Sequence, residues 1–396
     1  MTAPTLPDLF TWLERSRREG EVHFDERQRA WMVLGHPEVS AVLGDPHTFS
    51  SDLGDLQPRQ EDLDLFRRGN FVQMDPPRHD SLRRLVSRAF TPRVVAGLAP
   101  RITAVTAELL DEQAGEERFD LVDDLAYPLP VIVIAELLGI PAADRPVFRR
   151  WADALFERPE IGPDQPLTRL TDDRALNAVA PVLHEMNAYL LEHVRAHRET
   201  PADNLTGNLV RAEADGERLS DEEIIGFVGL LLLAGHITTT ATLGNTVVAL
   251  DEHPDAAAEL RADPALLPDA IEEVLRLRTP FPRLARLAST DTMIGGQPVA
   301  AGDMVIPWLA AANRDSRVFA EPERFDIRRD PNPHLTFGHG IHFCLGAPLA
   351  RLEARIAMES LLRRYREIAV DTAATVHRNP WVMLSPTKLP VTVVPA

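Results

Sequence analysis

The stretch Phe337-Gly338-His339-Gly340-Ile341-His342-Phe343-Cys344-Leu345-Gly346 contains the only cysteine in this chain of 396 residues. A single cysteine forms neither an intrachain disulfide nor a CxxC redox pair. Three roles remain for Cys344, namely metal ligand, nucleophile or small residue of the core. His334, His339 and His342 lie nearby in the sequence, and histidine and cysteine are common ligands of zinc. His342 is also placed to serve as general base for a cysteine nucleophile.

The glycines of this stretch indicate a tight bend of the backbone. Gly338, Gly340 and Gly346 allow positive φ angles, or a close approach of the backbone to a flat and bulky group. A long helix is predicted to begin directly after them, at Ala347-Pro348. Cys344 therefore falls at the amino end of a helix, where free N–H groups and the helix dipole stabilise a thiolate. A permanently anionic sulfur suits an axial ligand of iron.

The composition limits the partners that the protein has. Its net charge of −18 argues against a nucleic-acid partner, since affinity for phosphates comes mainly from basic surface. The longest apolar run, 224–234, is too short to span a bilayer and predicts a buried helix. The amino end lacks a signal-peptide core, so a cytoplasmic protein without a membrane anchor is expected.

The hydrophobic pattern predicts a mainly α fold with a minor β-sheet region in one domain, 1–396. Apolar residues recur at spacings of three and four over 79–277, which predicts helices there. The expected helix-rich core is about 79–280 and 345–366, and the expected β-rich part is about 20–50, 281–311 and 380–396. Within these parts we expect strands at 21–24, 30–34, 292–294, 297–300, 304–309 and 391–394, helices from after Pro37 to near Asp45 and over 348–366, and irregular chain at 51–70 and 312–334.

A second motif is Glu273-x-x-Arg276, whose spacing puts an acid and a base on one face of a helix. Such a pair is most often a solvated surface bridge. Arg324, in the irregular segment, is a candidate third member that would make it a buried charge network anchoring this segment.

A third motif is Ala234-Gly235-His236-Ile237-Thr238-Thr239, at the end of the apolar run. Small residues followed by hydroxyls loosen a helix, because a threonine side chain competes for the backbone carbonyl. This makes room for a small ligand beside a hydroxyl. The alternative is a notch that packs against another helix.

A fourth motif follows Pro76-Pro77. His79 and Arg83 share one helix face, and two donors on one face suit a carboxylate or a propionate. Arg84 and Arg88 share a neighbouring face that suits an acidic partner. The alternative for both pairs is a solvated basic helix.

These four motifs, in this order, resemble those of the cytochrome P450 superfamily, in particular its soluble bacterial members. Phe337-x-x-Gly340-x-x-x-Cys344-x-Gly346 is similar to the haem-binding signature of that family. Glu273-x-x-Arg276 with Arg324 is similar to its charge triad, and Ala234-Gly235-x-x-Thr238 is similar to its oxygen-binding motif. The joint occurrence is far more specific than any one motif, and it replaces the zinc interpretation.

The resemblance implies the cytochrome P450 fold and haem b (iron protoporphyrin IX) as cofactor, with the Cys344 thiolate as proximal ligand of the iron. The implied haem contacts are His79, Arg83, Arg286, Phe337, Gly338, His342, Cys344 and Gly346, of which His79, Arg83, Arg286 and His342 match positions that hold the propionates. The implied oxygen-side residues are Ala234, Gly235, Ile237, Thr238 and Thr239. Many family members have an acid before this threonine, whereas this chain has Ile237.

The resemblance also implies a monomeric monooxygenase that inserts one oxygen atom of O2 into a hydrophobic small molecule. Electrons are expected from ferredoxin and ferredoxin reductase, with Arg84 and Arg88 in the docking surface. A polyketide, a macrolide or another specialised metabolite is the expected substrate. The expected pocket residues are Leu232, His236, Phe281, Arg283, Leu284, Val382 and Met383. Alternatives are a non-hydroxylating reaction, such as oxidative coupling or peroxide-driven oxidation, and a haem-thiolate sensor or gas-binding module.

Overall fold

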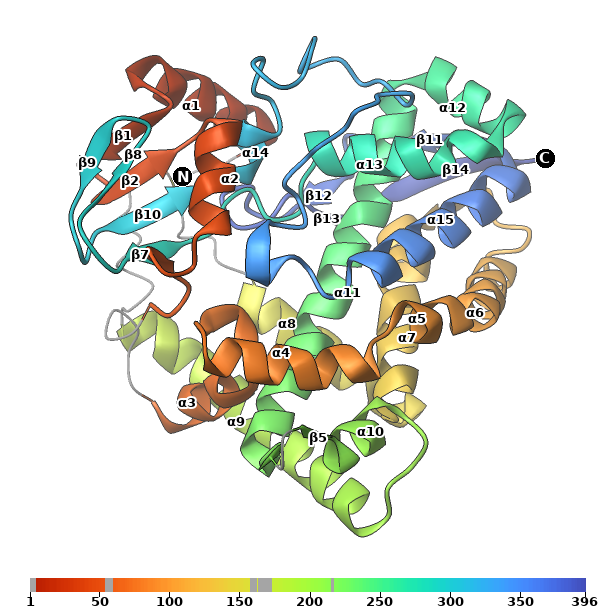
Figure 1. The fold of residues 1–396 in the computed structure, drawn as a ribbon. Helices are drawn as coiled ribbons and strands as arrows, with labels where there is room; N and C mark the ends of the chain where they lie inside the picture. Colours follow the sequence, from red (N-terminus) through yellow and green to blue (C-terminus); the bar gives the residue numbers. More distant parts are fainter. Residues whose placement is uncertain (1–4, 54–59, 157–161, 163–172, 215–216) are drawn as a thin grey trace.

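The computed structural model describes residues 5–53, 60–156, 162, 173–214 and 217–396. Helices make up most of the molecule, and a smaller β region lies on one side of it (Figure 1). The α-helices are α1 (Leu6–Glu19), α2 (His36–Gly44), α3 (Glu61–Gly69), α4 (Arg78–Ala89), α5 (Pro92–Gly97), α6 (Ala99–Glu112), α7 (Pro128–Leu138), α8 (Arg145–Phe156), α9 (Asp173–Glu199), α10 (Leu205–Arg211), α11 (Asp221–Glu252), α12 (Pro254–Ala262), α13 (Leu267–Leu277), α14 (Leu309–Ala312) and α15 (Ala347–Arg364). Short helical turns are η2 (Phe71–Gln73), η3 (Val122–Ala126), η4 (Ala142–Asp144), η6 (Pro264–Leu266) and η7 (Gly340–His342).

The strands form small sheets. They are β1 (Val22–Asp25), β2 (Ala30–Val33), β3 (Phe49–Ser50), β4 (Arg118–Asp120), β5 (Glu213–Ala214), β6 (Glu217–Arg218), β7 (Arg286–Ala288), β8 (Thr292–Ile294), β9 (Gln297–Val299), β10 (Met304–Pro307), β11 (Tyr365–Val370), β12 (Val376–His377), β13 (Pro386–Lys388) and β14 (Pro390–Pro395). The largest sheet has the order β1-β2-β10-β7-β3, in which β10 runs parallel to β2. A mainly α fold with a minor β region is therefore confirmed.

The helix α11 is the centre of the core. The Ser220 hydroxyl caps its amino end by accepting a hydrogen bond from the Glu223 N–H at 3.2 Å, and the Glu223 carboxylate accepts one from the Ser220 N–H at 3.0 Å. The helix is long and apolar enough to cross a membrane by composition, yet 78% of its most apolar window is buried inside the protein. The predicted buried helix at 224–234 is thus confirmed, and α3, α7, α9 and α15 all pack against it.

The helix α3 corrects the prediction of an irregular segment over 51–70. Gly69 approaches α11 so closely that a Cβ there would lie 2.0 Å from the Glu223 carbonyl oxygen. A Cβ at Gly226 would lie 2.5 Å from the Gly69 nitrogen and from the Phe66 carbonyl oxygen. The few apolar residues of this segment show no clear helical period. The close contact between the backbones of α3 and α11 stabilises a helix there. The rest of this prediction, 54–59, lies outside the described residues.

Other observed boundaries differ from the predicted ones because strands from distant parts of the chain pair with one another. The predicted helical region 79–277 also contains β4, which pairs with β14 from the far end of the chain, and the β5–β6 hairpin. The predicted last helix ends at Arg364, because Tyr365 begins β11, which pairs with β14. Irregular chain between α14 and η7 is confirmed.

Candidate active site

The cysteine loop is shaped by two glycines and one backbone hydrogen bond. The Cys344 N–H donates to the Phe337 carbonyl at 2.8 Å and closes the loop. Gly338 and Gly340 have φ angles of 76° and 71°, in the left-handed region that glycine adopts without strain. A Cβ at Gly340 would also lie 2.8 Å from a backbone oxygen of α2. Glycine is therefore required at this position by both conformation and space.

The loop delivers Cys344 to the amino end of α15, as predicted. Its thiol has many protein neighbours, yet the side chain remains accessible. Burial raises the pKa of the Cys344 thiol, whereas the backbone N–H groups of Gly346 and Ala347 and the charges of Arg83 and Arg351 lower it. An accessible sulfur with amide donors and two cations around it suits an anionic metal ligand.

Four polar side chains meet beside this loop. The ring centroids of His79 and His342 lie 4.5 Å apart. Burial lowers the pKa of His342 to about 3, and the charges of Arg286, His79 and Arg83 act in the same direction. Arg83 donates from Nη2 to the Phe343 carbonyl at 2.5 Å, which ties α4 to the cysteine loop. The structure thus brings together the residues that the sequence assigned to the propionates.

Several nitrogen atoms of this group are buried without a hydrogen-bond partner among the described residues. They are His79 Nε2, Arg83 Nη1 and both ring nitrogens of His342. An unsatisfied buried donor costs about 1–3 kcal/mol. Arg286 is only 6% exposed and donates to the Ala285 carbonyl at 2.8 Å. Because carboxylates accept hydrogen bonds from several donors at once, these residues fit the propionates of haem b.

A further network supports the cysteine loop from α13 and α15. The Arg351 guanidinium lies 4.4 Å from the Phe337 ring centroid and donates from Nε and Nη2 to Glu272 at 2.7 Å each. His334 Nε2 lies 3.1 Å from the same carboxylate. Burial opposes ionisation, but the hydrogen bonds of Arg351 and His334 outweigh it and lower the pKa of Glu272 to about 2. His334 is therefore engaged in supporting the loop, and this network was missed because its members lie on three separate segments.

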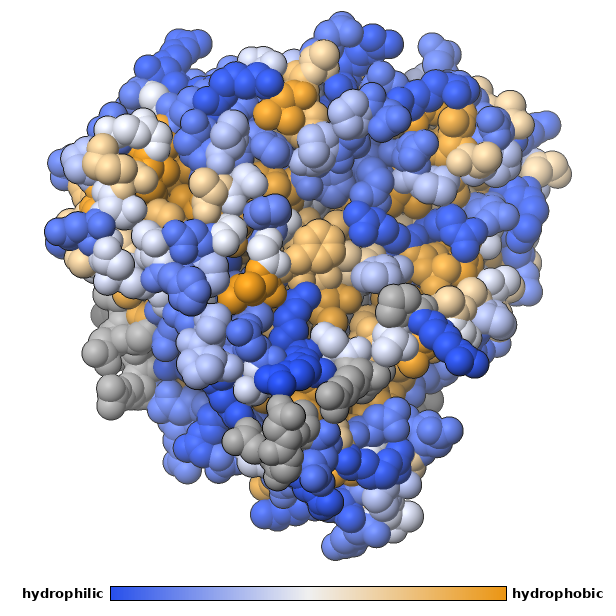
Figure 2. Space-filling view, viewed as in Figure 1, coloured by the Kyte–Doolittle hydropathy of each residue, from blue (hydrophilic) through white to orange (hydrophobic). Residues whose placement is uncertain are grey.

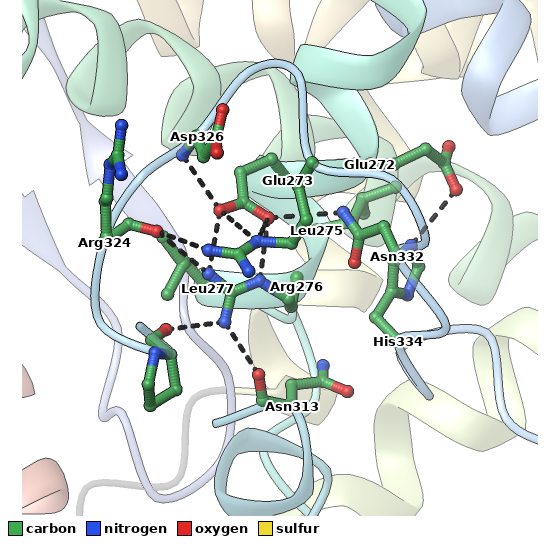
Figure 3. A network of polar contacts seen from close by, with 12 residues as sticks. Glu272, Glu273, Leu275, Arg276, Leu277, Asn313, Arg324, Asp326, Asn332 and His334 are labelled. Atoms are coloured by element: carbon green, nitrogen blue, oxygen red, sulfur yellow. Dashed lines mark hydrogen bonds and ion pairs between the residues drawn. The ribbon is translucent and has the colours of Figure 1, made fainter. Parts of the chain in front are cut away.

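The charge triad contains Glu273 and Arg276, as predicted, with both side chains 0% exposed. Arg276 donates to the two Glu273 oxygens at 2.7 and 2.8 Å. The prediction of the Arg324 guanidinium as third member of the triad is wrong, since that group is exposed and bonds to Glu321 at 2.9 Å. Figure 3 shows that Arg324 points its side chain away and offers only its carbonyl to the network.

The third member of the triad is Arg329, which is its second cation. Its Nε lies 3.1 Å from both carboxylate oxygens of Glu273, and its side chain is 9% exposed. Asn332 donates to the same carboxylate at 3.2 Å. Sequence reasoning missed Arg329 because Arg328 and Arg329 are adjacent and only the path of the chain turns one of them inward. The network anchors the irregular segment to α13, which was the predicted role.

The threonine motif lies on α11. Thr238 Oγ1 donates to the Ala234 carbonyl at 2.8 Å, and Thr239 Oγ1 donates to the Gly235 carbonyl at 3.2 Å. The predicted competition for backbone carbonyls is therefore present, although α11 continues without a break. Ala234 is exposed in the middle of this otherwise buried helix. The accessible surface at Ala234 and Thr238 marks the side of α11 that is open to a ligand.

Ile237 is buried, with 3% of its surface exposed. Its side chain carries no titratable proton and forms no hydrogen bond. The position before Thr238 is therefore apolar in the structure as well as in the sequence, and a carboxylate relay at that point is absent.

The predicted pocket residues divide into two groups. Leu232, His236 and Met383 have no exposed surface, so their assignment to an open pocket is corrected. His236 lies two residues from Ala234 and two from Thr238, which turns it to the opposite side of α11, where its ring meets that of Tyr127 at 5.5 Å. The partly exposed residues are Phe281, Arg283, Leu284 and Val382.

The predicted docking residues lie on α4. Arg84 is exposed there, whereas the side chain of Arg88 lies outside the described residues. Figure 2 shows hydrophobic residues at the surface between α4 and α15, with hydrophilic residues around them. Phe343, next to the cysteine, is 42% exposed on the loop between these helices.

Known proteins resemble this chain along nearly its whole length. The family model described as Cytochrome P450 matches residues 22–393. Cyclomarin C epoxidase CymV of Salinispora arenicola is 44% identical over 364 residues, which cover 91% of this chain and 90% of that protein. Erythromycin C-12 hydroxylase of Saccharopolyspora erythraea is 46% identical over 372 residues, with 92% and 88% covered.

A solved structure shows the same architecture. The hydroxylase HmtN, involved in himastatin biosynthesis, superposes with a TM-score of 0.84 at 44% identity, and the match covers 100% of both chains. Sequence, cysteine loop and fold agree, and the residues around the loop fit haem b. The chain therefore belongs to the cytochrome P450 family and is a monooxygenase with haem b as its cofactor.

Proposed function

We propose that the enzyme hydroxylates or epoxidises a hydrophobic specialised metabolite, such as a polyketide or a macrolide, with electrons from a ferredoxin. The observation that carries this proposal is the accessible surface at Ala234 and Thr238 on an otherwise buried helix. It leaves room for a small ligand beside a hydroxyl group. Relatives of similar length include an erythromycin hydroxylase and a cyclomarin epoxidase, which supports the substrate class.

Residues of the chain have different roles on the two faces of the cofactor. When bound, haem b supplies the activation of O2 by thiolate-ligated iron. Although burial raises the pKa of the Cys344 thiol, the N–H groups of Gly346 and Ala347 and the charges of Arg83 and Arg351 favour its anionic form, and the buried donors of His79, Arg83, Arg286 and His342 would hold the haem propionates. Thr238 presents a hydroxyl that turns from the Ala234 carbonyl to a nearby water or ligand by rotation about one bond. Since Ile237 carries no titratable proton, protons must reach the Thr238 hydroxyl through water or from the substrate.

We infer that the exposed face of α4 and the cysteine loop binds the ferredoxin. Arg84 supplies positive charge and Phe343 supplies apolar surface, and an acidic partner is steered to such a face. Arg84→Glu should raise the KM for ferredoxin several-fold at low salt. Oxidation driven by hydrogen peroxide should stay unchanged, since it needs no partner. Equal effects on both reactions would contradict docking at this face.

The experiment that tests the function is a screen of polyketide and macrolide compounds with the purified holoenzyme. Binding is read from the low-spin to high-spin shift, and the binders are then incubated with ferredoxin, ferredoxin reductase, NADPH and isotopically labelled O2. We expect a product that contains one labelled oxygen atom. An oxidised product without the label would favour oxidative coupling, the reaction to which the buried Ile237 gives weight.

A further inference from the structure

The ion pair of Arg351 and Glu272 turns its cation toward the cysteine loop. Arg351 lies four residues after the start of α15, about 6 Å along the helix axis, and its guanidinium covers the Phe337 ring at 4.4 Å. The Phe337 carbonyl accepts the Cys344 N–H at 2.8 Å. Glu272 belongs to α13, and among the described residues its carboxylate bonds to Arg351 and His334 and not to the cysteine loop. The positive end of the pair therefore faces the loop.

The charge of Arg351 acts on the Cys344 sulfur. Burial raises the pKa of the Cys344 thiol, and the charge of Arg351 is one of the influences that lower it. The hydrogen bonds to Glu272 raise the pKa of Arg351, and a thiolate at Cys344 raises it further. The guanidinium is thus always charged. A cation that favours an anionic sulfur also favours an added electron on an iron bound to that sulfur, because both are negative charges.

Arg83 is the other cation that acts on the sulfur, but it belongs to the group that fits the haem propionates. Its Nη1 has no partner among the described residues, and a propionate is the counter-charge expected there. The counter-charge of Arg351 comes from the protein itself, since Nε and Nη2 donate to the two Glu272 oxygens at 2.7 Å each. Glu272 can therefore be changed without removing a residue that would hold the cofactor.

His334 keeps the carboxylate of Glu272 in its ionised form. Its Nδ1 accepts the Thr336 N–H at 3.3 Å, which leaves the ring proton on Nε2, and Nε2 lies 3.1 Å from Glu272. Figure 3 shows the two side chains next to each other. The carboxylate thus accepts three N–H donors, and these lower the pKa of Glu272 to about 2 against the effect of burial. Both members of the pair are charged at neutral pH.

We propose that this pair adjusts the reduction potential of the haem iron, with Arg351 raising the potential and Glu272 lowering it. The inference rests on the proposed function, in which Cys344 is the thiolate ligand. Both are positioning residues, since they act through the cysteine loop. The step that they govern transfers one electron from ferredoxin to the ferric iron, which becomes ferrous while the ferredoxin is oxidised. A nearby cation stabilises the added negative charge, and a nearby anion opposes it.

A purely structural role of the pair predicts a different pattern. The helices α13 and α15 pack against each other, and the pair also ties them together. Loss of either partner would then loosen the same loop and shift the potential in the same direction. Shifts of opposite sign in the two variants therefore distinguish a role of charge from a role in folding.

The test is a spectroelectrochemical titration of the holoenzyme with small redox mediators, so that docking of ferredoxin plays no part. In Arg351→Gln the ratio of ferrous to ferric enzyme at a fixed potential should fall about threefold or more, as for the loss of one unit charge near a surface. In Glu272→Gln the ratio should rise, and the double variant should lie between the two. Arg351→Lys keeps the charge and should stay closer to the wild type than Arg351→Gln.

Arg355→Gln is the matched control, since Arg355 lies one turn further along α15 in a surface pair with Glu359 at 3.7 Å. It should keep the wild-type potential. Shifts of the same sign in Arg351→Gln and Glu272→Gln overturn the proposal, and so does an unchanged potential in Glu272→Gln, which decides the question even if Arg351→Gln loses its haem. A wild-type CO complex without the red-shifted Soret band refutes thiolate ligation and with it the proposed function. Equal potentials in an enzyme that shows this band refute only the present inference.

Discussion

Arg329 Nε lies 3.1 Å from each carboxylate oxygen of Glu273, and this contact completes a buried network that anchors the irregular segment before the cysteine loop. The carboxylate receives two further bonds from Arg276 and one from Asn332. Since the segment leads directly to the loop that carries Cys344, the network helps to fix the position of that loop and of the Cys344 sulfur.

Arg329→Met should therefore destabilise the holoenzyme, whereas Arg324→Ala should leave it unchanged. Removing one partner of a buried ion pair costs about 3–5 kcal/mol, and we expect the lower end of that range because Arg276 still holds Glu273. Among the described residues, the exposed Arg324 side chain forms its hydrogen bond with Glu321, on the surface. Urea unfolding followed by circular dichroism measures both. A larger loss of stability in Arg324→Ala than in Arg329→Met would contradict the assignment.

Cys344→Ser should abolish the strongly red-shifted Soret band of the reduced CO complex, because a serine hydroxyl does not replace a thiolate as iron ligand. His339→Ala is the matched control, since His339 is an exposed residue of the same loop. Its CO spectrum should equal that of the wild type. Retention of the band in Cys344→Ser would refute ligation by this cysteine.

Arg286→Ala and His342→Ala should weaken the retention of haem. Each removes a buried donor that fits a propionate, and a hydrogen bond to a charged group contributes about 1.5–3 kcal/mol. The rate of haem transfer to apomyoglobin should therefore rise about tenfold or more. Arg363→Gln, an exposed arginine on α15, should show the wild-type rate. Wild-type rates in both alanine variants would place the propionates elsewhere.

Ile237→Glu should change the proton supply on the oxygen side. A positioned general acid contributes roughly a hundredfold or more where proton transfer limits the rate. We expect product formation per NADPH to increase, with Ile237→Gln as a control of similar size that carries no titratable proton. The measurement compares NADPH use, peroxide release and product in one assay. Unchanged coupling and rate in the glutamate variant would remove any mechanistic meaning from the missing acid.

The buried carboxyl group of Glu353 should make the stability of the folded protein depend on pH. This residue of α15 is 1% exposed, its Oε2 has no partner among the described residues, and burial raises its pKa to about 8. Between about pH 4.5 and pH 8 the unfolded chain releases this proton and the folded chain keeps it, so stability falls as the pH rises through that window. The Tm of Glu353→Gln minus that of the wild type should therefore increase from pH 5 to pH 8. Glu359→Gln, on the same helix in a surface pair with Arg355, should give a constant difference.

The chemistry of the cysteine loop followed from local sequence. Gly338 and Gly340 permit the positive φ angles observed there, and Pro348 favours the start of a helix at its first turn. The spacing of Glu273 and Arg276 likewise holds on any helix. These properties depend on residues within a few positions of one another, which is why the tight bend of the cysteine loop, the helical core and the buried pair of Glu273 and Arg276 were predicted correctly.

The errors concern contacts between distant segments. Helix α3 is stabilised by Gly69 against Gly226, more than 150 positions apart in the printed sequence. The strand β4 exists because β14 pairs with it. No local pattern records such partners, since each segment alone is too short to be stable.

The sequence by itself indicated the cytochrome P450 family and a glycine-rich loop that puts Cys344 at the start of a helix, because these motifs depend on the spacing of their own residues. Only the tertiary structure decided which charges turn inward. Arg329 took the place of Arg324 in the network around Glu273, and His236 turned away from the oxygen side of α11. The path of the chain through space chooses between residues of equal chemistry, and no local pattern of the sequence records that path.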